Sequence, residues 1–270
     1  MPLDSTSAPP LWTHDRAVRY VVPLREGGSL PAVVETEDGA TVVLKFRGSG
    51  QGAKALVAEL VVGGLARSWG LPVPELRVVE LDDDFGRLEP DPEIQDVLRA
   101  SRGVNVGMDF LAGAYNFDAA ADLDGVDPLL ASRIVCLDAL CWNIDRTARN
   151  PNLMVQGGGL WMIDHGAALY PHHDWATVDE AKASRRFAQL ADHVLLPRAS
   201  ALRSTADEAR RALADDVIDR VLDAVPDALL LDAPAGVQAD FEHGGEARAA
   251  YRGLLRARVR SVTTVLGLTA

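Results

Sequence analysis

Three polar side chains, Asp145, Asn150 and Asp164, are spaced so that they could place a base and metal ligands around one reaction. Asp145 and Asn150 lie five positions apart within 141–155, and Asp164 follows a short hairpin pattern. Phosphoryl transfer requires a carboxylate near the attacking hydroxyl group and oxygen ligands for magnesium. We predict that one loop carries Asp145 as the catalytic base and Asn150 as a Mg²⁺ ligand. The hairpin would return Asp164 to the same edge as the second Mg²⁺ ligand.

The clustering of asparagine supports this prediction. The chain contains five asparagines, and three of them lie between positions 143 and 152. Asp and Asn often cap or stabilise turns, so Asp145 or Asn150 taken alone fits a structural role. The joint pattern of helix, Asp, Asn, hairpin and a further Asp is much more restrictive, and it favours the functional interpretation.

Lysine is rare in this chain: of 27 basic residues, only Lys45, Lys54 and Lys182 are lysine. Lys45 lies in the apolar strand pattern 42–46, from which its ammonium group could reach the α- and β-phosphates of a nucleotide. The alternative is a lysine that protects an edge strand from aggregation. Because the chain otherwise uses arginine, we favour the phosphate role.

Glu59 is a candidate partner for Lys45. It follows Lys45 by 14 positions and is the only acidic residue between positions 53 and 69, a segment with a helical pattern. An ion pair between the two side chains would orient the lysine toward the phosphates. A solvated glutamate on the helix surface is the alternative.

Gly27, Gly28 and Ser29 precede the Lys45 strand, at the position of a turn that could cover a nucleotide. They lack both of the glycine spacings that typify phosphate-binding loops. A plain turn between two strands therefore remains an equal alternative to a nucleotide-binding role.

These residues fall into a β-rich first part and a helical second part. A connector rich in glycine and alanine near 111–116 separates the two parts. Alternating apolar residues predict strands, whereas longer apolar stretches bounded by Gly and Pro predict helices. The expected strands are three antiparallel ones within 20–47, then 76–81, 104–111 and a hairpin of 153–155 with 160–163; the expected helices are 53–69, 128–142 and stretches near 177–195, 205–224 and 244–267.

The composition excludes several classes of protein. The 270 residues carry a formal net charge of −12, which opposes nonspecific binding to nucleic acid or to anionic membranes. No run of 18 apolar residues and no basic-then-apolar N-terminus is present, so we expect neither a membrane span nor a signal peptide. The expected location is the cytoplasm.

Cysteine and histidine do not predict a metal centre. Cys136 and Cys141 lie five apart in an apolar helical segment, which favours buried free thiols. His165, His172 and His173 lie near acidic residues, but their spacing does not establish the geometry that zinc requires.

Taken together, the residues from about 20 to 175 resemble the HipA-like kinases, a bacterial branch of the kinase superfamily related to the phosphoinositide kinases. The resemblance is strongest at Lys45, at 143–152 and at 164–166. It implies an α+β, two-lobed, protein-kinase-like fold: a β-rich N-lobe with one main helix (14–111), and a helical C-lobe with a small hairpin (112–270). Residues 1–13 would form a loose tail. Aminoglycoside phosphotransferases share the Asp-to-Asn step, but their His-Gly before the aspartate is absent here.

The resemblance implies ATP and Mg²⁺ as cofactors and assigns residue roles. Lys45 would hold phosphate, Asp145 would be the catalytic aspartate, and Asn150 and Asp164 would hold magnesium. The backbone of Asp109, Phe110 and Leu111 would meet adenine.

The phosphoacceptor is not fixed by these residues. A protein Ser/Thr side chain is favoured, a small molecule or lipid headgroup is the alternative enzyme substrate, and a nucleotide-binding pseudokinase or scaffold is the alternative without turnover. The chain is shorter than the toxin-type HipA proteins and has no obvious counterpart of their N-terminal extension, which leaves the toxin role open.

Overall fold

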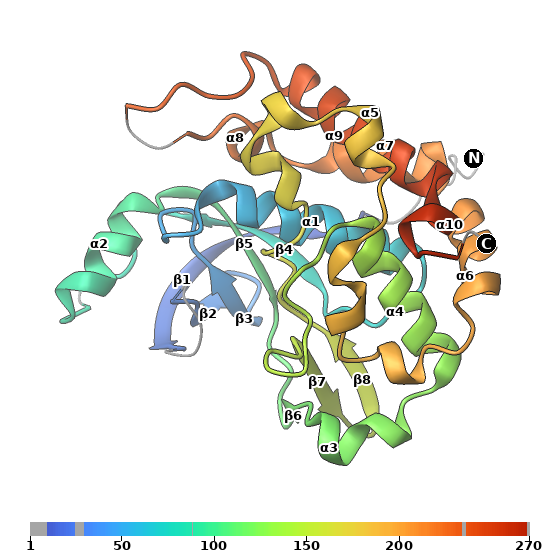
Figure 1. The fold of residues 1–270 in the computed structure, drawn as a ribbon. Coiled ribbons are helices and arrows are strands. Elements are labelled where there is room, and N and C mark those ends of the chain that lie inside the picture. Colours follow the sequence, from blue (N-terminus) through green and yellow to red (C-terminus); the bar gives the residue numbers. More distant parts are fainter. Residues whose placement is uncertain (1–9, 25–29, 88, 234–235, 269–270) are drawn as a thin grey trace, which may run out of the picture.

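The computed structural model describes residues 10–24, 30–87, 89–233 and 236–268. Its elements combine strands and helices, as the sequence predicts. In Figure 1 the strands β1 to β5 and helix α2 lie on the left, and helices α4, α6 and α10 lie on the right, with the small sheet β6–β8 at the bottom.

Five strands form a closed barrel in the first part of the chain. The order is β1-β2-β3-β5-β4, and every neighbouring pair is antiparallel except the parallel pair of β1 with β4 that closes the barrel. The predicted trio of antiparallel strands within 20–47 is confirmed. The five strands are β1 (Thr13–Pro23), β2 (Ala32–Thr36), β3 (Thr41–Lys45), β4 (Leu76–Leu81) and β5 (Gly103–Asp109).

Ordered structure begins earlier than the sequence predicts. The side chain of Trp12 is only 3% exposed and packs in the main core, and β1 starts at Thr13. The expected loose tail therefore does not extend to position 13. The physical reason is the burial of a large aromatic ring, whose apolar area outweighs the Pro- and Ser-rich composition before it.

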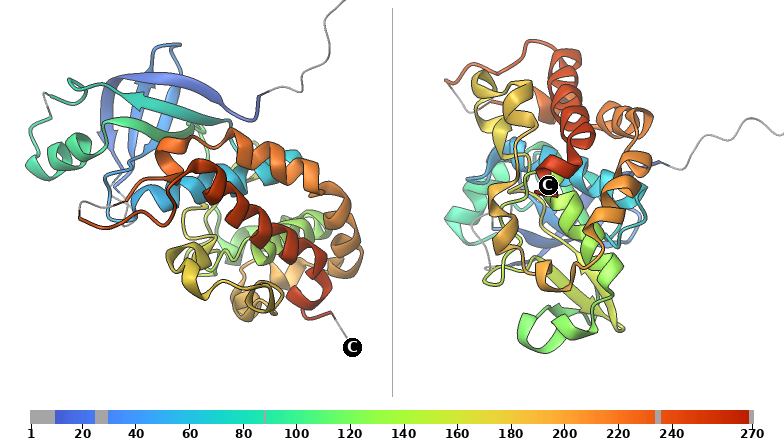
Figure 2. Two further views of the ribbon diagram at one scale, coloured as in Figure 1. Left: turned by 90° about the horizontal axis from the view of Figure 1, so that it is seen from above. Right: turned by 45° about the vertical axis from the view of Figure 1, so that its right-hand side comes forward.

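Helix α1 (Gly52–Ser68) runs between the barrel and the helical part (Figure 2). Thirteen of its 17 residues are buried, because the barrel covers one side and α7 (Asp215–Ala224) and α8 (Asp227–Leu230) cover another. Two adjacent glycines allow both contacts. A Cβ atom on Gly63 would lie 2.7 Å from Leu76, and one on Gly64 would lie 3.0 Å from Val221.

The second part of the chain carries a small sheet that presents the candidate catalytic loop. Helix α4 (Pro128–Leu140) is capped by Asp127, whose carboxylate accepts from the Leu130 N–H group at 2.8 Å. The predicted hairpin is confirmed as β7 (Leu153–Gln156) and β8 (Gly159–Met162). A two-residue strand, β6 (Tyr115–Asn116), adds a third member that is too short to be predicted from periodicity.

The expected helix at 177–195 is wrong. The segment forms only the short α5 (Glu180–Ala183) and a 3-10 helix at Ala188–Asp192. Between them the Phe187 N–H group donates to the Val265 carbonyl, so this segment bonds to the C-terminal turn instead of continuing a helix. The expected stretch 205–224 is two helices. The remaining helices are α2 (Pro92–Ala100), α3 (Ala119–Asp122), α6 (Leu202–Ala212), α9 (Gly244–Arg260) and α10 (Val262–Val265).

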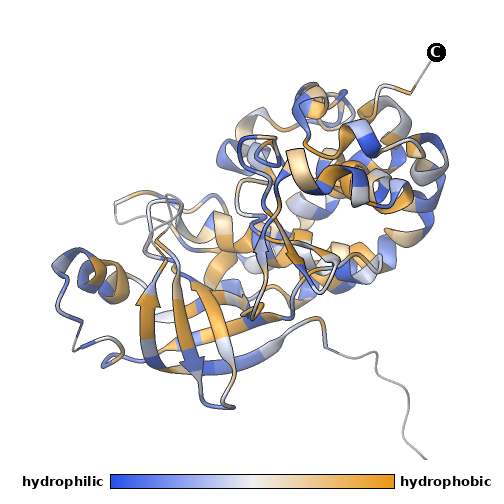
Figure 3. Cartoon of the chain, turned by 90° about the horizontal axis from the view of Figure 1, so that it is seen from below, coloured by the Kyte–Doolittle hydropathy of each residue, from blue (hydrophilic) through white to orange (hydrophobic). Residues whose placement is uncertain are grey.

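Two large apolar clusters stabilise the fold, and a small third one joins Ala183 of α5 to Leu254 and Ala257 of α9. One fills the barrel, whose strands are largely hydrophobic in Figure 3, and the larger one extends from α1 through α4 to the C-terminal helices. Cys136 and Cys141 are buried free thiols, as predicted, and burial raises the pKa of both. Within the described ranges, none of the helices combines the length and the apolar character needed to cross a bilayer.

Candidate active site

Lys45, Glu59 and Asp164 form one cluster at the mouth of the barrel, in which Lys45 and Glu59 are buried and Asp164 is partly exposed. Lys45 ends β3, Glu59 lies in the middle of α1, and Asp164 follows β8. The Lys45 Nζ atom contacts Glu59 Oε1 and lies 2.6 Å from Asp164 Oδ1. Lys45 is 6% exposed and Glu59 is 2% exposed. The predicted pairing of Lys45 with Glu59 is therefore present, and the alternatives of an edge-strand lysine and a solvated glutamate do not fit.

The three charges control each other's ionisation. Burial disfavours the Lys45 ammonium ion, but the two carboxylates outweigh this effect and raise the pKa of Lys45. Burial also opposes ionisation of Asp164, and Lys45 outweighs it and lowers the pKa of that carboxyl. Burial raises the pKa of Glu59. One ammonium ion thus serves two carboxylates, which favours an additional cation beside Asp164.

Asp145 and Asn150 lie together in the loop after α4. The Asn150 Nδ2 atom donates to Asp145 Oδ2 at 2.7 Å, and Asn152 Nδ2 donates to the same oxygen at 3.3 Å. Asp145 is half-buried and Asn150 is exposed. The Ile163 N–H group donates to the Asn152 carbonyl at 3.1 Å, which brings this loop next to the residue before Asp164. The structure therefore brings the predicted base and both predicted metal ligands into one neighbourhood.

Backbone conformation is unusual in this neighbourhood. Among the described residues, five non-glycine residues have a positive φ, and four of them lie between 142 and 169. Asp164 has φ +53° and Asn152 has φ +48°. Asp and Asn tolerate the left-handed region better than other residues, and such conformations gather at functional sites.

A cleft of about 580 Å³ opens beside this cluster. Lys45 and Asp164 line one end, and Asp109, Phe110 and Leu111 line another. The Asp109 N–H group donates to the Glu75 carbonyl at 2.9 Å, and the Phe110 N–H group donates to the Thr41 carbonyl at 2.9 Å. Of the three backbone N–H groups predicted to meet adenine, that of Leu111 is the one that makes no hydrogen bond within the described part of the chain.

The sequence-family model described as HipA-like kinase matches residues 18–244. The chain belongs to the HipA-like kinase family. It is therefore a phosphotransferase, as the resemblance at Lys45, 143–152 and 164–166 implies.

Two solved structures resemble this HipA-like kinase. The crystal structure of the Helicobacter pylori proinflammatory kinase CtkA has a TM-score of 0.48 at 12% identity, covering 92% of this chain and 97% of the other. The crystal structure of the Golgi casein kinase with Mn/ADP bound has a TM-score of 0.44 at 13% identity, covering 94% and 72%. No curated protein sequence matches the chain.

The oxygen ligands fit a magnesium ion. An ionised carboxylate can only accept hydrogen bonds, so the Asn150 amide turns its Nδ2 atom toward Asp145. Its Oδ1 atom is then free to bind a cation. Asp164 would be the second ligand, and its side chain is 41% exposed. Mg²⁺ typically takes one or two protein ligands together with substrate phosphates. No group of three or more His, Cys, Asp or Glu side chains in the described ranges could hold a metal.

The predicted turn at Gly27, Gly28 and Ser29 lies outside the described residues. His165 and His172 are both buried, and burial lowers the pKa of His165 to about 3, so its ring is neutral at physiological pH. His172 bonds instead to the Tyr251 hydroxyl group at 2.9 Å.

A buried ion pair behind the loop was missed by sequence reasoning. Arg146, the residue after the predicted base, donates to Asp138 Oδ2 at 2.6 Å, and His193 Nε2 lies 2.9 Å from the same oxygen. Arg146 also donates to the Asn152 carbonyl and lies 3.2 Å from His165 Nδ1. One guanidinium group thus connects α4, the loop that carries Asp145 and Asn152, and His165, which follows Asp164. Asp138, the one acidic residue in the largely apolar helix 128–140, is the signal that could have revealed it.

Proposed function

We propose that this HipA-like kinase transfers the γ-phosphoryl group of ATP, in a Mg²⁺-dependent reaction, to a hydroxyl group. The observation that carries the proposal is the contact of one buried lysine with both Glu59 and Asp164. An ammonium group held in this way is directed along the cleft, where it can bind two phosphates of a nucleotide whose base lies near Leu111.

Each side chain has a distinct role in the proposed reaction. Asp145 accepts or orients the proton of the attacking hydroxyl group, and Asn150 and Asp164 hold the magnesium ion. Bound magnesium neutralises charge on the phosphates during transfer. Lys45 fixes the phosphates, and Glu59 fixes Lys45. Catalysis then consists mainly of positioning and electrostatic stabilisation.

Nucleotide binding and phosphate transfer are assigned to different parts of the chain. We assign residues 14–111, the barrel with α1, to nucleotide binding as an N-lobe, and residues 112–270 to the catalytic loop and helices of a C-lobe. Arg258 supports this assignment for the C-terminal helices. It lies 3.7 Å from the Trp142 ring centroid and donates to the carbonyls of Ala139 and Leu140, so α9 secures the end of α4 immediately before the catalytic loop.

A protein hydroxyl group is the favoured acceptor. Asp145 is half-buried, and two neighbours, Ile144 before it in the chain and Asn150 bonded to its carboxylate, are exposed. The base therefore lies at the protein surface rather than in a small closed cavity. This geometry suits a Ser or Thr side chain presented on a surface. A small-molecule or lipid-headgroup acceptor is the second enzyme candidate, and a pseudokinase would show nucleotide binding without turnover.

The direct test is a Mg-ATP turnover assay with the purified chain and labelled ATP, with Asp145→Asn as the matched inactive variant. We expect slow hydrolysis or autophosphorylation in the wild type that the variant lacks. Incubation with a protein mixture followed by phosphosite mapping identifies the acceptor. Nucleotide binding with no phosphate transfer to water, protein or small hydroxyl compounds would favour the pseudokinase instead.

A further inference from the structure

Lys54 is a lysine at a position that neither the composition of the chain nor the helix around it favours. It lies in the first turn of α1, which has no acidic residue in that turn and no side-chain cap. The amide dipoles of a helix disfavour a positive charge at this end. Arginine is the usual cation of the chain, and Lys54 is one of three lysines. Favourable contacts must therefore compensate for its position.

The Lys54 ammonium group bonds to two segments of the second part of the chain. Its Nζ atom donates to the His172 carbonyl at 2.7 Å and lies 2.7 Å from Asp240 Oδ2. His172 lies eight positions after Asp164, and Asp240 lies four positions before the start of α9. One ammonium group thus joins α1 to the segment after Asp164 and to the segment before α9.

Both of these segments are held in place by further contacts. The His172 ring is buried, and its Nδ1 atom lies 2.9 Å from the hydroxyl oxygen of Tyr251 in α9. Phe241, which follows the aspartate, packs edge-to-face against Trp175 with 5.5 Å between the ring centroids. Lys54 therefore binds a carbonyl and a carboxylate whose segments are fixed to the helical part of the chain.

Helix α1 approaches the segment after Asp164 closely at Gly166. A Cβ atom on Gly166 would lie 3.2 Å from Glu59 Oε1 and 3.4 Å from the Ala55 Cβ atom. Glu59 lies five positions after Lys54 in the same helix, which is about 7.5 Å along its axis. A shift of the first turn of α1 away from the second part of the chain would therefore change the distance between Glu59 and Asp164.

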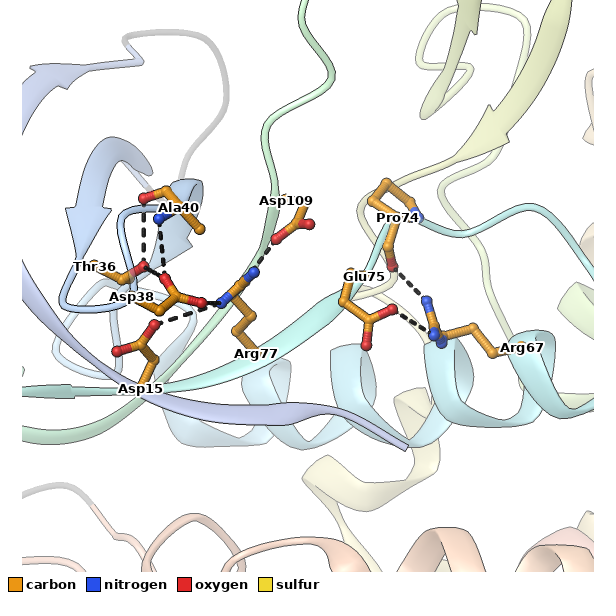
Figure 4. Close-up of polar contacts among 9 residues, drawn as sticks. All are labelled: Asp15, Thr36, Asp38, Ala40, Arg67, Pro74, Glu75, Arg77 and Asp109. Carbon is orange, nitrogen blue, oxygen red and sulfur yellow. Dashed lines mark hydrogen bonds and ion pairs between the residues drawn. The ribbon is translucent and has the colours of Figure 1, made fainter. Parts of the chain in front are cut away.

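An ion pair at the opposite end of α1 provides a comparison. Arg67 lies in the last turn, where its Nη2 atom donates to Glu75 Oε2 at 2.6 Å and its Nη1 atom donates to the Pro74 carbonyl at 3.4 Å (Figure 4). Both partners lie in the first part of the chain, immediately before β4. The side chains of Lys54 and Arg67 are each 29% exposed. The two cations therefore match in charge, exposure and helix, but they bind different parts of the chain.

We propose that Lys54 is a positioning residue for phosphoryl transfer. It fixes the first turn of α1 against the segment that follows Asp164. It thereby sets the distance of Glu59, and through it of Lys45, from Asp164. This inference rests on the proposed function, because it requires these three side chains to act on one nucleotide. Lys54 acts through α1 and Glu59 rather than on the nucleotide itself.

The test compares Lys54→Met with Arg67→Met by steady-state kinetics and thermal unfolding of the full chain, with ATP hydrolysis or autophosphorylation as the reaction. Each variant removes one ion pair of α1. Lys54→Met should lower kcat about tenfold or more and change the KM for Mg-ATP less than about threefold, because misaligned groups lose their effect mainly in the transition state. Arg67→Met is the matched control. It should lower the melting temperature by a similar amount and keep the wild-type kcat.

Two further variants test the contact itself. Lys54→Arg should keep most of the wild-type kcat, because a guanidinium group at this partly exposed position can donate to both a carboxylate and a carbonyl. Asp240→Asn removes the ion pair and leaves the His172 carbonyl, so it should lower kcat by less than Lys54→Met. In Lys54→Met with Asp240→Asn the two losses should not add, because both variants remove the same interaction.

The outcomes separate the inference from the proposed function. A folded Lys54→Met with the wild-type kcat would overturn the inference and leave the proposed function intact. If Lys54→Met does not fold, a wild-type kcat in Asp240→Asn has the same meaning. An equal fall in kcat in Lys54→Met and Arg67→Met would also overturn the inference, because general loosening of α1 would explain both. A wild-type chain that transfers no phosphate to water, protein or small hydroxyl compounds would overturn the inference together with the proposed function.

Discussion

The Nζ atom of Lys45 lies 2.6 Å from Oδ1 of Asp164, although 119 positions separate the two residues in the chain. The contact joins the last residue of β3 to the second residue after β8, and Glu59 supports it from α1. The three side chains together carry one positive and two negative charges. A bound divalent cation would offset the excess, so we expect nucleotide and metal binding to be strongly coupled here.

Asp164→Ala should abolish productive Mg-ATP binding and leave the fold intact, because the metal loses its carboxylate ligand. Thermal shift measures this directly. Wild type should be stabilised by Mg-ATP by roughly RT ln(1 + [L]/Kd), about 3 kcal/mol at a hundredfold excess over Kd, and the variant should gain little. Asp96→Ala in α2, an exposed aspartate paired with Arg99, should respond as wild type does. Absence of a nucleotide-dependent shift in wild type would count against the proposed site.

Lys45→Arg should lower turnover strongly although it keeps the charge. The small cavity between Lys45 and Glu59 measures about 10 Å³, so the larger planar guanidinium group cannot occupy the position of the ammonium group beside Glu59. Steady-state kinetics should show a loss of about a hundredfold or more in kcat/KM. Lys182→Arg is the matched control, because Lys182 lies in α5 and bonds to the Thr177 hydroxyl group. Normal turnover in Lys45→Arg would reassign Lys45 to a structural role.

Asp145→Asn should separate binding from chemistry. The side chain keeps its size, and Asn150 and Asp164 remain to hold the metal, so the affinity for Mg-ATP should change little. Turnover should fall by at least about a hundredfold, because a positioned base contributes ~10²–10⁴-fold. Both quantities should be measured on one preparation. A parallel fall in affinity would mean that Asp145 acts as a metal ligand or a structural residue.

Arg146→Met should destabilise the chain by about 3–5 kcal/mol, because it leaves the fully buried Asp138 carboxylate without its ion pair. Urea denaturation measures the loss. Arg146→Lys should cost less stability but still reduce turnover, since a lysine cannot contact Asp138, the Asn152 carbonyl and His165 together. Arg99→Met on the surface of α2 should change the free energy of unfolding by less than about 0.5 kcal/mol. Wild-type turnover in Arg146→Lys would exclude a positioning role.

His172 should make stability depend on pH. Burial, with the positive charges of His173 and Lys54, holds the pKa of His172 well below its ordinary value of 6.5. Below that pH the unfolded chain binds a proton that the folded chain does not, so the free energy of unfolding falls as the pH decreases. The slope from this group approaches ~1.4 kcal/mol per pH unit. His172→Phe should make the profile below pH 6.5 less steep, with the remaining slope coming in part from the buried His165, and His14→Phe, at an exposed position, should not.

Much of the barrel and of the candidate site could be predicted from the sequence, because the strands and helices that carry them give clear patterns within short segments. The Lys45 strand, the helix carrying Glu59 and the hairpin before Asp164 each have a clear period and clear end signals. Contacts between residues that are far apart in the chain have no comparable local sequence pattern. The parallel pairing of β1 with β4 and the contact of His193 with Asp138 depend on tertiary packing. The segment 177–195 has helical periodicity, but its backbone bonds go elsewhere, so tertiary contacts override its propensity.

The scarcity of lysine gives the buried cluster a built-in chemical reporter. The chain has three ε-amines, and reagents that acylate neutral amines should modify Lys54 and Lys182 before Lys45, whose side chain is 7% exposed and held in its protonated form by two carboxylates. An event that separates Lys45 from Glu59 would add a third labelled site. Peptide mass spectrometry would resolve that site at a single residue, and so would follow the opening of the cluster without any substrate being known.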